Sequence, residues 1–108
     1  MVYFIFQEQR YVKIGYTVDR PFERLGELQV GNPHTMRLEG LMFNATVGDE
    51  RAIHDRFKQY LLRGEWYLLS PEIIGYMHKH CDEVDLGVDS SLVAATDRLA
   101  AIRQALKK

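Results

Sequence analysis

Four side chains of the kinds that handle phosphate groups and protons stand in the first half of the chain. They are Tyr3, Lys13, Arg24 and Glu50. A phenol that loses its proton is a base, a guanidinium holds two phosphate oxygens at once, an ammonium is a point charge for phosphate, and a carboxylate is a hard ligand for divalent cations. Side chains of these types can bind a phosphate or a divalent cation and move a proton.

Each of these side chains also has an ordinary interpretation. Tyr3 fits a core tyrosine, Lys13 a solvent-facing strand residue, and Arg24 a solvated helix residue. At helical spacing, Glu50 and His54 share a face with apolar residues. They either find partners there or lie at the solvated edge of the stripe, because burying them unpaired is costly.

The pattern of apolar residues predicts the elements that carry these groups. Residues 2–7 and 11–16 are rich in β-branched and aromatic side chains and predict a hairpin of two strands. Pro21 suits the first turn of a helix that the segment 31–33 ends. Residues 36–43 predict a third strand with a bulge at Gly40, and residues 50–62 predict a second helix.

The rest of the chain predicts mainly helix. A short extended segment covers residues 65–69, and Ser70 followed by Pro71 opens a helix that runs to about residue 81. Gly87 is interpreted as a break before a last amphipathic helix. We therefore expect a domain over residues 1–86 and a C-terminal helical extension over residues 87–108.

Five short segments in this order resemble the GIY-YIG endonuclease superfamily, and most closely its phage-borne branch related to a meiotically up-regulated fungal family. The segments are Val2-Tyr3-Phe4-Ile5, Val12-Lys13-Ile14-Gly15-Tyr16-Thr17, the stretch from Arg24-Leu25 to Gly31-Asn32-Pro33, the stretch from Glu50 through His54 to Phe57, and Gly64-Glu65-Trp66-Tyr67. The resemblance covers residues 2–70. It implies an α+β fold with a small three-stranded antiparallel sheet flanked by helices.

The resemblance also implies roles for the residues. Glu50 would bind a single divalent ion, Mg²⁺ or Mn²⁺, and Arg24 would hold the phosphate, with Arg20 and Lys13 as further substrate contacts. Tyr3 would be the base, assisted by the Lys13 ammonium, which favours the phenolate. Tyr16 and His54 are second candidates for positioning water or phosphate.

Two departures from the family pattern bear on these roles. Lys13 stands where the second motif has a tyrosine, and Glu65-Trp66 stands where some relatives place an asparagine. Trp66 is interpreted as a core anchor, and Glu65 as a cap or the partner of an arginine. The group His78-Lys79-His80-Cys81 has no zinc-site spacing.

Composition limits the classes of function. The chain has 108 residues, with 14 basic and 15 acidic side chains, so its formal net charge is -1. That excludes binding of nucleic acid through bulk positive charge but leaves a local basic site open. A lone cysteine excludes an intrachain disulfide. The apolar start lacks the features of a signal peptide and no run is long enough to span a membrane, so we expect a cytoplasmic, phage-encoded protein with no membrane partner.

These observations predict a metal-dependent DNA endonuclease or nickase. The alternative is a nuclease-like module that binds nucleic acid or a protein partner without catalysis, and a third option is a defence-related or toxin-like phage nuclease. The expected partners are DNA and, through the C-terminal helix, a second copy of the chain or another protein.

Overall fold

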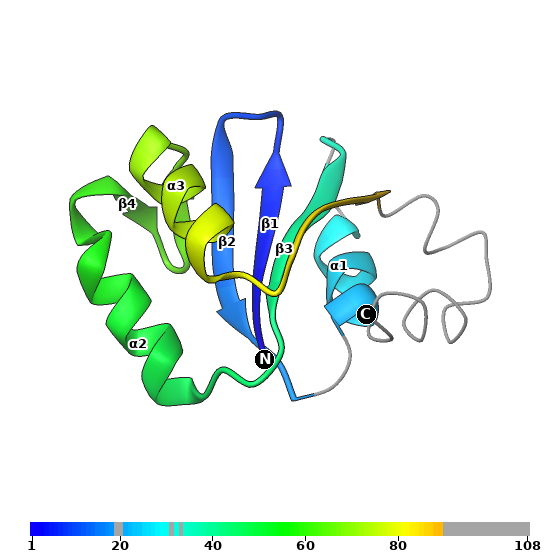
Figure 1. The fold of residues 1–108 in the computed structure, drawn as a ribbon. Coiled ribbons are helices and arrows are strands. Elements are labelled where there is room, and N and C mark those ends of the chain that lie inside the picture. Colours follow the sequence, from blue (N-terminus) through cyan, green and yellow to red (C-terminus); the bar gives the residue numbers. More distant parts are fainter. Residues whose placement is uncertain (19–20, 31, 33, 90–108) are drawn as a thin grey trace.

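A six-stranded antiparallel sheet is the framework of the part of the chain that the structure describes, residues 1–18, 21–30, 32 and 34–89 of a computed structural model (Figure 1). The strand order is β4-β5-β2-β1-β3-β6. The elements, in chain order, are β1 (Val2–Gln7), β2 (Tyr11–Tyr16), α1 (Pro21–Gln29), β3 (Met36–Met42), α2 (Val47–Arg56), a 3₁₀ turn (Lys58–Tyr60), β4 (Leu61–Arg63), β5 (Trp66–Leu68), α3 (Pro71–His80) and β6 (Glu83–Asp89).

The predicted hairpin forms the centre of the sheet. In β1 and β2, Val2 pairs with Tyr16 and Gln7 with Tyr11, and β3 pairs with the other edge of β1. The turn between β1 and β2 places Glu8 and Gln9 at φ 57 and 54. Both are non-glycine residues in the left-handed region, which is uncommon and costly.

Alternation along β1 divides the core into two layers. Val2 and Phe4 contact the cluster formed with α2 and α3, which includes Ile53 and Ile73. Tyr3 belongs to the cluster on the opposite face, against α1. Successive strand residues point to opposite faces, so the Tyr3 side chain emerges on the α1 side of the sheet.

The prediction of an α+β fold is confirmed, and the prediction of three strands is wrong. The sheet has six strands because two short segments and a C-terminal one extend it: β5 pairs with β2, β4 with β5, and β6 with β3. Strands of three residues such as β4 and β5 are too short to show a period. In β6, Val84, Leu86 and Val88 alternate with polar or small residues, a strand signal that was missed.

The second helix is shorter than expected. α2 spans Val47–Arg56 and ends at Phe57 (φ -107, ψ 18), where the expected helix continued to residue 62. Leu61 pairs with Tyr67 across the β4–β5 hairpin instead. Residues 58–60 form a 3₁₀ turn in which the Tyr60 amide donates to the Phe57 carbonyl, and pairing with β5 begins at Leu61, so helical periodicity over residues 57–61 was misleading.

The expected boundary after residue 86 falls inside a strand. β6 runs through Asp89, and its pairing with β3 extends to the Arg37–Asp89 pair. The expected C-terminal helix lies outside the described residues, so it stays a prediction. Within the described residues, none of the helices is both long and apolar enough to cross a membrane.

Candidate functional site

The first part of the site is the phenol of Tyr3 lying against Gly15. The two residues are partners in the β1–β2 ladder, and Tyr3 is 1% exposed. A Cβ at position 15 would lie 2.3 Å from the Tyr3 oxygen and 2.4 Å from Cζ. Only glycine leaves room for the ring, which explains the glycine within a strand.

The cation bonded to this phenol is Arg24. Its Nε donates to the Tyr3 hydroxyl oxygen at 3.5 Å, and its Nη1 contacts Glu27 Oε2 at 3.1 Å. α1 holds the arginine beside the sheet because Leu25 is buried in the same cluster as Tyr3. Burial raises the pKa of the Tyr3 phenol, and Arg24 partly offsets that rise. The phenol is therefore protonated at neutral pH.

Lys13 has a carboxylate partner. It is 8% exposed, and its Nζ lies 3.1 Å from Oε1 of Glu65. Glu65 follows Gly64, whose φ of 57 makes the tight turn between β4 and β5. The Ile14 amide donates to the Glu65 carbonyl at 3.1 Å, which ties this turn to β2. The expected pairing of Glu65 with an arginine is replaced by a pairing with Lys13.

The second part of the site is a group of three potential metal ligands: Glu50, His54 and Glu65. One ligand atom from each lies within 4.8 Å of the others. α2 supplies two of them because the side chain of Thr46 accepts from the Asp49 amide in a capping box, which starts the helix just before Glu50. The turn after β4 supplies the third.

His54 is held in one tautomer by the edge of the sheet. Its Nε2 lies 2.7 Å from the carbonyl oxygen of Ile14. A carbonyl can only accept, so Nε2 carries the hydrogen, and the neutral ring keeps its lone pair on Nδ1. Histidines that bind metals commonly have this arrangement, with the other ring nitrogen donating to a backbone carbonyl.

The carboxylate of Glu65 destabilises the charged form of Glu50. Burial raises the pKa of Glu50, the neighbouring Glu65 carboxylate raises it further, and His54 and Lys13 act in the opposite direction. Two nearby carboxylates with an imidazole are a donor set that a divalent cation would stabilise, since its charge offsets their repulsion. The residues therefore fit the expected ion.

The two parts of the site are electrostatically connected. The carboxylates of Glu65 and Glu50 both raise the pKa of the Tyr3 phenol. The Tyr3 ring lies against Gly15, and the neighbouring Ile14 carbonyl accepts from His54, so the two parts meet along residues 13–15 of β2. This region lies where the pairing of β5 with β2 ends at Lys13. The structure thus brings together Tyr3, Lys13, Arg24, Glu50 and His54 from the predicted residues, and it adds Glu65.

Tyr16 is half-buried and packs against the cluster of α2 and α3, on the face opposite Tyr3 and on the side of α2, which carries Glu50 and His54. Arg20 lies outside the described residues. Glu65 was missed as a site residue, although a carboxylate directly after a turn glycine was visible in the sequence.

Groups away from this region do not resemble a catalytic site. Glu50, His54 and Glu65 are the one set of three or more potential ligands found among the described residues, so the segment 78–81 forms no such set. Burial raises the pKa of the Cys81 thiol to about 12, which makes it a poor nucleophile at neutral pH.

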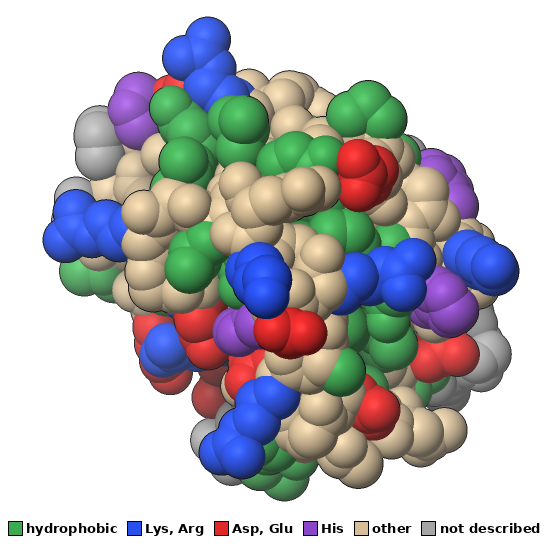
Figure 2. Space-filling view, turned by 90° about the vertical axis from the view of Figure 1, so that its left-hand side faces the viewer, with side chains coloured by type: hydrophobic (Ala, Val, Ile, Leu, Met, Phe, Trp, Pro, Cys, Tyr) green, Lys and Arg blue, Asp and Glu red, His purple; other side chains and the backbone are tan. Residues whose placement is uncertain are grey.

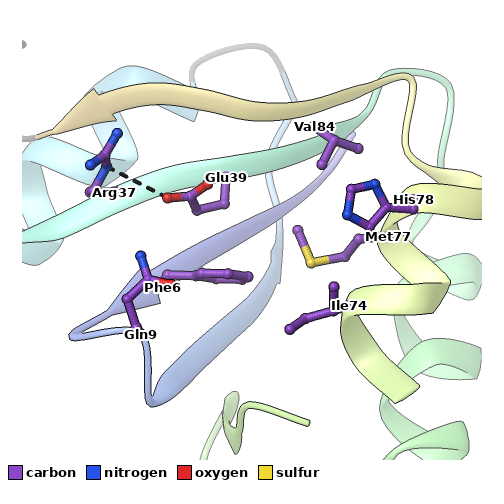
Figure 3. Close-up of a pocket in the computed structure, with 8 residues that line it drawn as sticks. All are labelled: Phe6, Gln9, Arg37, Glu39, Ile74, Met77, His78 and Val84. Atoms are coloured by element: carbon purple, nitrogen blue, oxygen red, sulfur yellow. Dashed lines mark ion pairs between the residues drawn. The ribbon is translucent and has the colours of Figure 1, made fainter. Parts of the chain in front are cut away.

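A cavity of about 290 Å³ lies between α3 and strands β3 and β6 (Figure 3). Its walls include Phe6 and Met77, and its floor holds Glu39, which contacts Arg37 at 3.5 Å. Phe6 and Met77 belong to the core cluster on the α2 and α3 side. The cavity therefore opens away from Tyr3 and Arg24.

Fold and site together define a small α+β domain with acidic, basic and phenolic side chains gathered at one part of its sheet. The chain belongs to the T5orf172 domain family, whose profile matches residues 1–83. The family is phage-associated and reported to be nuclease-like. Neither the curated proteins nor the solved structures that were compared gave a match.

Proposed function

We propose that the chain is a metal-dependent endonuclease that hydrolyses DNA phosphodiester bonds. The observation that carries the proposal is the approach of Glu50, His54 and Glu65 to within 4.8 Å of one another, beside Lys13, which pairs with Glu65. Membership of a nuclease-like, phage-associated family supports it further.

The residues divide the chemistry between them. Arg24 is half exposed and presents a fork of donors to non-bridging phosphate oxygens. Glu50, with His54 and Glu65, would hold a Mg²⁺ or Mn²⁺ ion. Such an ion polarises the phosphate and lowers the pKa of a bound water.

The roles of Tyr3 and Lys13 in this proposal differ from those that the resemblance implies, in which the Lys13 ammonium assists Tyr3 as the base. Because burial raises the pKa of Tyr3, the phenol keeps its proton at neutral pH and is suited to orient the attacking water by donating a hydrogen bond. To act as a base, the Tyr3 phenol must lose its proton, and this requires positive charge nearby. The cation bonded to the Tyr3 hydroxyl is the Arg24 guanidinium. Lys13, paired with Glu65, holds that carboxylate in position beside Glu50.

A supercoiled-plasmid assay tests the proposal. Wild-type chain should nick the plasmid with Mg²⁺ or Mn²⁺ and not with EDTA, and Glu50→Gln should lose at least about 100-fold in rate, the effect typical of removing a catalytic group. Glu72→Gln is the matched control, since Glu72 lies on α3 and bonds Tyr60. No metal-dependent nicking by the wild type, or equal nicking by Glu50→Gln, would overturn the proposal.

The alternative is a module that binds nucleic acid without cutting it. The net charge of -1 favours this alternative, because a freestanding nuclease gains affinity from a basic surface. It predicts metal-independent DNA binding and no product in the plasmid assay.

A further inference from the structure

A groove on the α1 face of the sheet lies next to the proposed active site. It has a volume of about 370 Å³, within the range of ligand clefts. It runs between the end of α1 and the β4–β5 hairpin. The residues that the argument uses are Tyr11, Leu28, Leu62, Arg63 and Trp66, and together they define what we call the Trp66 groove.

We propose that the Trp66 groove binds one unstacked nucleobase of the DNA strand that is cut. The inference rests on the proposed function for the identity of the substrate. Trp66 and Tyr11 are both half-buried, so each keeps part of its ring accessible. Leu28 and Leu62 add apolar walls. Aromatic side chains in such a setting bind bases by stacking without needing a particular sequence.

The position of the groove fits a base adjacent to the cleaved phosphate. Tyr11, Lys13 and Gly15 lie on one face of β2, and Lys13 is the ladder partner of Trp66. Residues two apart on a strand are separated by about 7 Å. The groove and the Tyr3 region thus lie along the same face of β2, with Lys13 between them.

The charges around the groove suit a polyanion. Arg63 lines it and is the ladder partner of Trp66, while Nζ of Lys13 lies 5.7 Å from the Trp66 ring. None of the described residues that line the groove is acidic. The Glu65 carboxylate, next to Trp66 in the chain, is paired with Lys13 at 3.1 Å, so a phosphate backbone passing along the rim meets Arg63 as the lining cation.

The tryptophan reports directly on this groove, because it is the one tryptophan of the chain. Titrating the full-length Glu50→Gln variant with single-stranded dT12 should quench its fluorescence. An abasic 12-mer keeps the phosphates and lacks the bases. It should bind about 10-fold more weakly and leave the fluorescence nearly unchanged, because stacking contributes about 5- to 150-fold per base.

Adjacent leucines of β4 give a matched pair of variants. Leu62 lines the groove and is 53% exposed, whereas Leu61 is 46% exposed and pairs with Tyr67, whose ring is buried on the other face. Leu62→Ala should weaken dT12 binding about 3-fold, and Leu61→Ala should leave it unchanged. Both side chains are exposed, so the fold tolerates either change.

In the fluorescence titration, the proposal would be overturned by equal quenching with dT12 and the abasic strand, by no quenching with either, or by quenching with rU12 but not with dT12. Equal effects of the two leucine variants on dT12 binding would also overturn it. The outcome is separable from that for the proposed function. A chain that nicks plasmid without quenching refutes the groove alone. A chain that quenches without nicking refutes catalysis and leaves the groove as a DNA-binding site.

Discussion

At the scale of residues, the site depends on pairs of side chains that are distant in sequence. The residue types were predictable, because each of Tyr3, Lys13, Arg24 and Glu50 stands in a recognisable segment. Their partners were not predictable. Which cation bonds the Tyr3 phenol, and which carboxylate pairs with Lys13, depends on how α1 and the β4–β5 turn pack on the sheet, and no local pattern encodes that packing.

Gly15→Ala should lower both stability and activity. The added Cβ would lie 2.3 Å from the Tyr3 oxygen and 2.4 Å from its ring carbon Cζ, and displacing a buried ring costs about 1–3 kcal/mol. Gly75→Ala is the control, because Gly75 lies in α3 with nothing within 4 Å of the added carbon, and it should stabilise by about 0.5–1 kcal/mol. Urea unfolding measures both. Equal effects of the two substitutions would show that the ring does not occupy the place described.

Glu50→Gln should stabilise the metal-free protein at neutral pH. The pKa of Glu50 is raised in the folded state. The stability that Glu50 contributes is therefore present at low pH, where its carboxyl group is protonated, and is lost as the pH rises through its folded-state pKa. The ionised form at pH 7 therefore destabilises the fold, and the amide removes this cost. Thermal unfolding at pH 4 and pH 7 checks the prediction, with a larger gain expected at pH 7.

Metal should reverse this order of stability. Mn²⁺ should raise the Tm of the wild type at pH 7 because it binds the folded form, and it should raise the Tm of Glu50→Gln much less. An equal Mn²⁺ effect on both proteins would contradict the assignment of Glu50 as a ligand.

At the scale of elements, short strands and a helix cap position the site. The hairpin of β1 and β2 and helices α1 and α3 were predictable from periodicity and caps. The segment of β5 was expected to be extended, but its pairing was not predictable, and neither was β4. Each has three residues, and strand pairing rather than local preference decides such segments. Because β5 ends opposite Lys13, the carbonyl of Ile14 is left for His54.

Alanine substitutions at the N-caps of α2 and α3 distinguish an effect on stability alone from an effect on the proposed metal site. The side chain of Thr46 accepts from the Asp49 amide at the start of α2, and that of Ser70 accepts from the Ile73 amide at the start of α3. Replacing either by alanine should cost about 1 kcal/mol in unfolding free energy. Only Thr46→Ala should also weaken Mn²⁺ binding, measured by titration calorimetry well below the Tm, because only α2 carries Glu50 and His54. Equal metal affinities would contradict this.

At the scale of the whole molecule, basic and acidic side chains nearly balance, with 14 of one kind and 15 of the other. Figure 2 shows basic, acidic and histidine side chains interspersed with apolar ones on the face that α2 and β4 turn outward, without a continuous field of one sign. This agrees with the net charge of -1. Attraction to DNA would thus come from a few side chains near the site, such as Arg24 and Arg63.

DNA binding should accordingly be weak and should release few counterions. With two or three phosphate contacts, the slope of log K against log salt should lie between about -1 and -3. Fluorescence anisotropy of a labelled duplex with Glu50→Gln, from 50 to 200 mM salt, measures it. A slope steeper than about -6 would mean that a broad basic surface is present and that the charge argument is wrong.

The most direct test of the account asks whether Tyr3 and Glu50 act in one site. Single-turnover cleavage of a labelled DNA is measured for Tyr3→Phe, Glu50→Gln and the double variant. Residues that act as a unit give non-additive losses. The account predicts that each single variant loses about 100-fold or more and that the double variant is no slower than the worse single one. Losses that multiply, or a single variant that cuts at the wild-type rate, would contradict it.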